Sequence, residues 1–165
     1  MNATVVLALG MLAGCAFVGS SNVPPDASEP DAPPDAAVPQ CASFQTIPGA
    51  PATSRYRQLA VSRTVAAQRT ACGDEGGHLV VIDSAAEAAA VEAFAVTRGG
   101  FFWIGLGDAA VEGEWMTEKS QPAMYLAWDR TQPDGGVGES CVLQGMERFF
   151  DFRCDAEYPS VCECD

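Results

Sequence analysis

Residues 132–154 read QPDGGVGESCVLQGMERFFDFRC, and the rest of the chain is best interpreted outward from this stretch. Four oxygen-bearing side chains surround its Pro/Gly turn, namely Gln132, Asp134, Glu139 and Asp151. Hard cations such as calcium take about 6–8 oxygen ligands, so a turn of this composition is a candidate cation site. Pro-Asp-Gly is also a common β-turn sequence, whose carboxylates are usually just solvated. The residues alone leave both interpretations open.

Two cysteines of the stretch belong to a larger set. The chain has seven cysteines, and apart from Cys15 they are Cys41, Cys72, Cys141, Cys154, Cys162 and Cys164. An even set in an exported chain implies disulfides, although many pairings are compatible with the spacing. A zinc site is disfavoured, because the chain has no Cys-x-x-Cys pair and no histidine other than His78.

Cys15 accounts for the odd cysteine. It ends the box Leu-Ala-Gly-Cys after an apolar run, which looks like a bacterial lipoprotein signal in which residues 1–14 are removed and Cys15 is lipidated. The run is too short for a transmembrane helix, which needs about 20 apolar residues. It departs from the usual signal because no Lys or Arg precedes it. The sequence therefore predicts an exported chain that is lipid-anchored to the bacterial outer membrane or cell surface. An ordinary secretory signal with an incidental cysteine is the alternative.

Composition separates a linker from a folded domain. Residues 15–40 are rich in proline and acidic residues and contain no Lys or Arg, which predicts a disordered, extended linker. Residues 41–165 then form the predicted domain. The net charge of −13 without a basic cluster argues against nucleic acid or anionic lipid as partners. The partner classes that remain are a glycan or a protein ligand at the cell surface. The lipid anchor is the only expected contact with the membrane.

The predicted elements give an α+β class, with two helices first and a loop-rich β half after them. The helices are predicted at 64–72 and 85–96, and Ser84 with Glu87 forms a capping box before the second. Short strands are predicted at 56–61, 79–82, 101–106, 141–143, 149–152 and 160–162. The loop over 107–139 is long for a compact domain, and loops of that length are usually functional or disordered.

These elements carry motifs that resemble the C-type lectin-like domain family over about 110 residues. The matching motifs are Gly76-Gly77-His78-Leu79, Trp103-Ile104-Gly105-Leu106, Glu112-Gly113-Glu114-Trp115, Gln132-Pro133-Asp134, Glu139-Ser140-Cys141 and Cys162-Glu163. The resemblance implies short antiparallel sheets, two helices and a long loop region stapled by disulfides. It implies the pairs Cys72–Cys162 and Cys141–Cys154. Because the ends of this fold lie side by side, we also expect a Cys41–Cys164 bond.

The resemblance further implies a calcium and sugar site. Carried over by position, Gln132, Asp134, Glu139 and Asp151 match family residues that hold calcium and carbohydrate hydroxyls. The peptide bond before Pro133 would be cis, as in the family. Gln-Pro-Asp resembles the galactose-type version of the motif.

Phe150 departs from the family pattern, because it stands where the family has a ligand Asn. The loss of that oxygen weakens the predicted calcium site. The aromatic that follows the motif in galactose-type members is Gly135 here, so Phe150 or Trp128 would have to supply the stacking platform. The favoured hypothesis is a carbohydrate-binding module that uses calcium. The alternative is a calcium-independent domain for protein binding or a structural surface role.

An enzyme is not predicted. His78 falls in a predicted strand, where a satisfied core or edge histidine is commoner than a catalytic base. No Ser or Cys has a partner that would activate it as a nucleophile.

Overall fold

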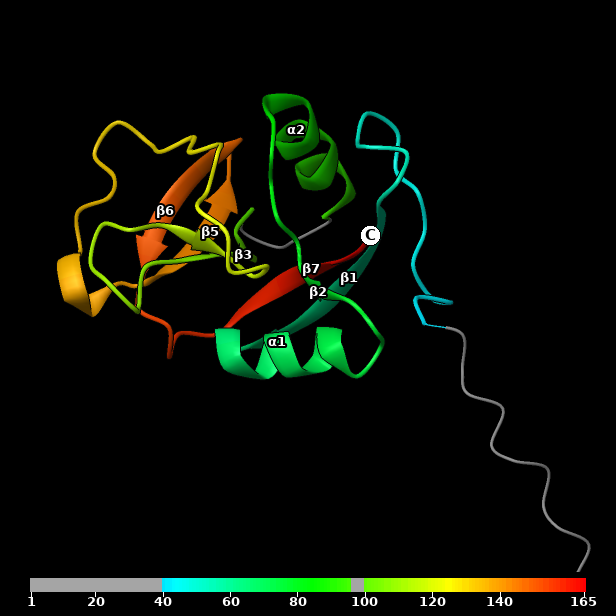
Figure 1. Ribbon diagram of the computed structural model, residues 1–165, viewed down its shortest axis with the longest axis horizontal. Coiled ribbons are helices and arrows are strands. Elements are labelled where there is room, and N and C mark those ends of the chain that lie inside the picture. The colour runs from blue at the N-terminus through cyan, green and yellow to red at the C-terminus, as the bar shows by residue number, and fades with distance from the viewer. Residues whose placement is uncertain (1–39, 96–99) are drawn as a thin grey trace, which may run out of the picture. The chain divides into compact units, whose positions relative to one another are not determined.

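The computed structural model describes residues 40–95 and 100–165. The described residues form two helices and a mixed sheet, which confirms the α+β class (Figure 1). The predicted signal at 1–14, the lipidation site Cys15, the linker up to residue 39 and the predicted helix end at Val96 lie outside the described residues. No helix among the described residues is long and apolar enough to span a bilayer.

The short strands join into one sheet. Its order is β1 (Arg55–Arg63), β7 (Tyr158–Cys164), β3 (Phe102–Gly107), β5 (Cys141–Gly145) and β6 (Arg148–Phe152), with β2 (His78–Leu79) on β7 and β4 (Met116–Thr117) on β3. The sheet is mixed because β3 and β7 run parallel where Trp103 faces Ser160, whereas the other pairs of labelled strands are antiparallel. The predicted strand at 79–82 keeps only its first residue in β2. Val80 explains this, because its N–H donates to Val161 while its carbonyl accepts from Gly105, so it links β7 to β3.

Both helices begin at a side-chain cap. Helix α1 (Val65–Gly73) follows Thr64, whose hydroxyl accepts from the Ala67 N–H. Helix α2 (Ala85–Phe94) follows Ser84, whose hydroxyl accepts from the Glu87 N–H at 3.2 Å. Such caps satisfy backbone donors that have no partner inside the helix. The Glu87 carboxylate reaches back to the Asp83 N–H at 2.9 Å, so the predicted capping residues act at this helix start.

The sheet divides the apolar side chains into two cores. Side chains alternate between the faces of a strand, so Phe102 and Ile104 point to one side of β3 and Trp103 to the other. The first two pack with Val91 of α2, and Trp103 belongs to the cluster that holds Val65 of α1. Figure 1 shows α2 and α1 on opposite sides of the β1–β7 pair, which matches this division.

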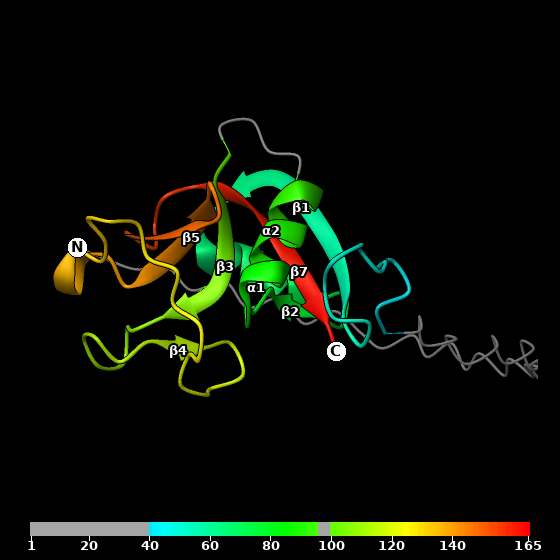
Figure 2. The same ribbon diagram turned by 90° about the horizontal axis from the view of Figure 1, so that it is seen from above.

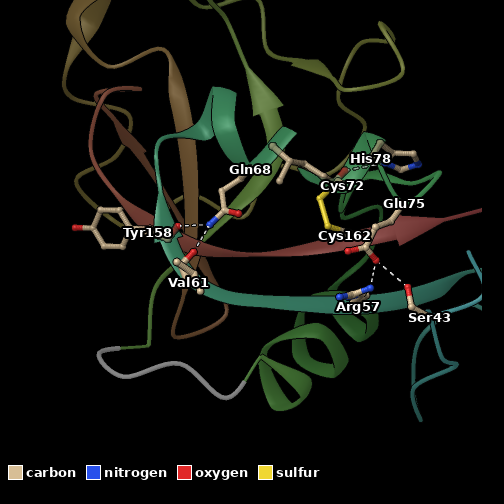
Figure 3. Close-up of a disulfide and its surroundings, with 10 residues drawn as sticks. Ser43, Arg57, Val61, Gln68, Cys72, Glu75, His78, Tyr158 and Cys162 are labelled. Carbon is tan, nitrogen blue, oxygen red and sulfur yellow. Dashed lines mark hydrogen bonds and ion pairs between the residues drawn. A yellow bond between two sulfur atoms is a disulfide. The ribbon is translucent and has the colours of Figure 1, made fainter. Parts of the chain in front are cut away.

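Three disulfides tie these parts together. They join Cys41 to Cys164, Cys72 to Cys162 and Cys141 to Cys154, the pairs expected from the sequence. Cys72–Cys162 fastens α1 to β7 (Figure 3). Beside it the buried Gln68 amide of α1 donates to the carbonyls of Val61 and Tyr158, at 2.7 Å each. Helix α1 is therefore held to both β1 and β7.

The long loop after β3 contains little regular structure. Within it lie β4 and a short 3-10 helix, η1 (Gly136–Gly138). Figure 2 shows this part of the chain beside β3 and β5, on the side away from the C-terminus. Gly105 permits the close packing beneath it, because a Cβ there would lie 2.5 Å from both the Leu79 carbonyl oxygen and Glu118 Cγ. The motif glycine thus lets β3 approach the chain after β2.

Candidate functional site

The candidate site lies where the long loop passes the edge strand β6. The loop is fixed to β6 on its approach, since the Phe149 N–H donates to the Ala127 carbonyl and the Asp129 N–H donates to the Phe149 carbonyl. A turn then follows, in which the Gln132 N–H donates to the Asp129 carbonyl at 3.1 Å. The loop therefore brings Gln132 and its neighbours against the end of β6.

Gln132 and Asp151 hold this loop reciprocally. The Asp151 carboxylate accepts from the backbone N–H of Asp134 at 3.1 Å and of Gly135 at 2.9 Å. In return, the Asp151 N–H donates to the Gln132 carboxamide oxygen at 3.0 Å, and the Gln132 amide donates to Asp134 at 2.8 Å. The Gln132–Pro133 peptide bond is cis, as expected. Asp151, only 2% exposed, therefore organises the loop through two backbone N–H donors.

Three carboxylates converge beside this network. Asp134, Glu139 and Asp151 each offer an oxygen, and these oxygens all lie within 4.8 Å of one another. Oxygens that share one calcium ion at about 2.3–2.6 Å lie no further than about 5 Å apart, so the carboxylates fit that ion. Burial raises the pKa of Glu139, the negative charges of Asp151 and Asp134 raise it further, and Arg153 opposes this. The cluster is therefore an acidic centre that a cation would stabilise.

Gly135 makes room for this arrangement. A Cβ at Gly135 would lie 2.1 Å from Oε2 of Glu139 and 2.4 Å from its Cβ, distances that no real contact reaches. The Glu139 side chain therefore folds over Gly135 toward the other two carboxylates. The glycine that replaces the family aromatic at this position is needed for packing.

The Phe150 ring does not replace the lost oxygen but packs against apolar residues. It meets Phe101 edge to face, with the ring centroids 5.2 Å apart. Phe150 lines a pocket of about 340 Å³ that also contains the four predicted ligand residues. Trp128 packs against Trp115 and Phe149 and does not line this pocket. Of the two predicted candidates for a stacking platform, only Phe150 is placed at the site.

His78 lies in a second polar cluster, with Glu163 and Asp165. Its Nδ1 faces the Leu79 carbonyl at 2.8 Å and its Nε2 faces Asp165 at 3.2 Å. Lys119 also binds Asp165, so this cluster already contains a cation. Although burial alone would raise the pKa of Asp165, hydrogen bonds from Lys119 and His78 hold it below its ordinary value. His78 is an edge-strand histidine with partners, as the sequence indicated.

A buried polar group on the α2 side was missed by the sequence analysis. The Tyr56 hydroxyl donates to the Glu87 carboxylate at 2.6 Å, and burial followed by this bond raises the pKa of Tyr56. Glu163 lies 3% exposed nearby, where it accepts from the Val81 N–H. Only the position of Glu87 in the capping box could have signalled that its carboxylate also has a packing role.

Comparisons with known proteins agree with this geometry. The family model of the lectin C-type domain matches residues 61–164 of this chain. A tetranectin-like protein of Carcharhinus perezii is 31% identical over 108 residues, which cover 62% of this chain and 65% of that protein. The chain thus spans at most about two thirds of the length of the curated relatives first matched.

Solved structures give the same answer. The carbohydrate-recognition domain of the mouse scavenger receptor C-type lectin is 27% identical, with a TM-score of 0.67 and coverage of 75% of this chain and 96% of that one. A calcium-independent type II antifreeze protein is 23% identical, with a TM-score of 0.66 and coverage of 74% and 92%, and supports the fold alone. The chain belongs to the C-type lectin domain family.

Proposed function

We propose that residues 41–165 form an extracellular carbohydrate-binding domain that uses calcium. The observation that carries the proposal is the convergence of the Asp134, Glu139 and Asp151 carboxylates on the loop that Gln132 and Asp151 lock in place. A mouse relative of the same fold is a carbohydrate-recognition domain, which supports this reading.

Calcium would be held by Gln132, Asp134, Glu139 and Asp151. The bound ion would supply a positive centre that takes two neighbouring sugar hydroxyls as ligands. The protein's own residues would orient those hydroxyls, since Asp134 and Glu139 line the pocket and their carboxylates accept hydrogen bonds. Gln-Pro-Asp favours galactose-type sugars in this proposal.

The second candidate function is a calcium-independent domain that binds a protein or has a structural surface role. Phe150 favours it, because its ring supplies no oxygen where the family pattern has a ligand. We propose binding in either case and not catalysis. His78 supports this, since both of its ring nitrogens already face partners.

The test compares the thermal midpoint of the protein in millimolar calcium and in chelator. A ligand that binds only the folded state raises the free energy of unfolding, so calcium should raise the midpoint. Glu139→Gln and Asp134→Asn should lose this rise, and Glu157→Gln, a matched change at an exposed acid outside the cluster, should keep it. Methyl galactoside and methyl mannoside are then titrated into the calcium-loaded protein. If the parent and the three variants each have the same thermal midpoint in calcium and in chelator, the result favours the second function.

Export and anchoring remain proposals from residues 1–40. We propose that residues 1–14 are a lipoprotein signal, that Cys15 carries the lipid and that residues 15–40 hold the domain away from the bacterial outer membrane or cell surface. Cys15→Ser should move the protein from the detergent phase to the aqueous phase and should abolish labelling by a radioactive fatty acid. Unchanged partition would contradict the anchor.

A further inference from the structure

We propose that the pocket beside the carboxylates is an apolar subsite, and that its ligand is a glycan whose sugar carries an apolar substituent such as an aryl ring or a short acyl group. The inference rests on the proposed function, because the carboxylate cluster is taken to hold the cation that binds the sugar. It adds the class of glycan, which neither the cluster nor the family membership specifies.

The walls of the pocket come from four strands or their flanks. Phe150 of β6 lies opposite Leu143 of β5 in the sheet and meets Phe101, which precedes β3, edge to face. Phe152 of β6 meets Tyr158 of β7 in the same way, with centroids 5.8 Å apart. All four rings are half-buried, so each keeps a part that the protein does not cover. The pocket is therefore walled by aromatic surface that is fixed on the sheet.

The same pocket includes the cation cluster. Its lining consists of Phe101, Gln132, Asp134, Glu139, Leu143, Phe150, Asp151, Phe152 and Tyr158. Phe150 and Asp151 are neighbours in the edge strand β6 and point to opposite faces of it, so the pocket joins the aromatic wall and the carboxylates around the edge of the sheet. At about 340 Å³ the pocket reaches the lower end of the range for small-molecule sites, about 300–1,000 Å³.

The pocket has a polar half, the carboxylates with their cation, and an apolar half, the aromatic rings, and the two together select the ligand. A fully polar monosaccharide would satisfy the cation and leave the rings against water, whereas a purely apolar molecule would leave the carboxylates and the cation unpaired. A sugar with an apolar substituent satisfies both halves, because its hydroxyls reach the cation while the substituent covers the rings. Burial of a ring-sized apolar area should strengthen binding by about tenfold or more.

Phe150 gives the proposal its sharpest consequence. The family oxygen ligand has been exchanged for a ring, so the substitution that restores the oxygen also removes part of the wall. Phe150→Asn should therefore bind calcium more tightly and lose the preference for a substituted sugar. A merely structural role for Phe150 predicts no such opposite changes.

The experiment measures, by calorimetry in saturating calcium, the affinity of 4-nitrophenyl and methyl β-galactosides and of the corresponding mannosides. We expect the aryl glycoside of one sugar to bind about tenfold or more tightly than its methyl partner. Phe101→Leu should reduce this ratio without changing calcium affinity, Phe150→Asn should reduce it while raising calcium affinity, and Met124→Ala, at an exposed apolar residue outside the pocket, should leave it unchanged. Thermal midpoints verify that each variant is folded.

The outcomes separate the inference from the proposed function. Equal affinity for aryl and methyl glycosides would overturn the apolar subsite and leave calcium-dependent sugar binding intact. A ratio that persists in both pocket variants would overturn it as well. If neither glycoside binds, sugar binding and the subsite fall together, and the calcium-dependent thermal shift then reports whether the cation site stands without them.

Discussion

The cation cluster requires a residue without a Cβ at position 135, because Glu139 occupies that space. The Gly135 backbone φ of −93° suits any residue, so only space limits it. Gly135→Ala would place a methyl group 2.1 Å from Oε2 of Glu139 and force that side chain away from Asp134 and Asp151. We expect calcium affinity to fall by about tenfold or more, as for loss of one charged ligand, and the thermal midpoint in chelator to fall as well, because the added Cβ would also lie 2.4 Å from the Glu139 Cβ and the loop backbone must shift.

The matched control is Gly138→Ala in the same loop, where an added Cβ meets no atom within 4 Å. Calcium titration by calorimetry should give the parent affinity for this variant. Equal weakening by both alanines would mean that the loop as a whole, and not the contact with Glu139, governs the site.

Glu163 predicts a pH dependence of stability. Burial raises its pKa above the ordinary 4.5, although the Val81 N–H and the Ser54 hydroxyl oppose the rise. A raised pKa means that the folded state holds the proton more tightly, so this group stabilises the fold below about pH 4.5 and loses that contribution as the pH rises through the raised pKa. Glu163→Gln keeps an acceptor for Val81 but cannot ionise.

The measurement is the thermal midpoint in chelator at pH 4 and pH 7.5. The midpoint of Glu163→Gln relative to the parent should be higher at pH 7.5 than at pH 4. A constant difference between the two proteins would show that Glu163 ionises in the fold without cost.

At the scale of elements, Gln68 determines how α1 meets the strands. Its amide donates to the ends of both β1 and β7, and its side chain is fully buried (Figure 3). Gln68→Met removes two hydrogen bonds at nearly constant volume, so the carbonyls of Val61 and Tyr158 lose the donor that Gln68 supplies. We expect the free energy of unfolding to fall by about 1–3 kcal/mol. Urea unfolding measures it, with the exposed Gln121→Met as the control that should change little.

The sequence predicted elements well where a local signal marks them. Ser84 caps α2 as predicted, and the helix predicted at 64–72 and the strand predicted at 101–106 became α1 and β3 with a shift of one residue each. The strand at 79–82 was overestimated, because apolar composition does not reveal that Val80 bonds to two different strands.

The site was predictable only in part for the same reason. The four oxygen-bearing residues carry a positional motif, so they could be named from the sequence. The aromatic wall could not, because Phe101 is brought to the β5–β6 hairpin and to Tyr158 by the pairing of β3 with β5 and with β7, across long sequence separations. Phe150 was recognised as a lost ligand, but its contact with Phe101 depends on the order of strands in the sheet.

At the scale of the whole molecule, the disulfides are nested. Cys72–Cys162 already links α1 to β7, so adding Cys41–Cys164 closes a further loop of only about 30 residues. The chain-entropy argument then assigns about 3–4 kcal/mol to Cys41–Cys164. The double variant Cys41→Ser/Cys164→Ser should lose about that free energy of unfolding, measured in urea, and still fold. A loss below about 1 kcal/mol would mean that the native contacts of residues 41–55 already hold that segment in place.

The same bond decides how the domain carries mechanical load. A pull on the chain at Gln40 enters Cys41 and passes through sulfur directly into β7, which lies between β1 and β3 in the sheet. From β7 the tension spreads through Cys162 to α1 and through backbone hydrogen bonds to both neighbouring strands. The segment from Cys41 to β1 therefore cannot be peeled away first, and the domain resists such a pull at its centre.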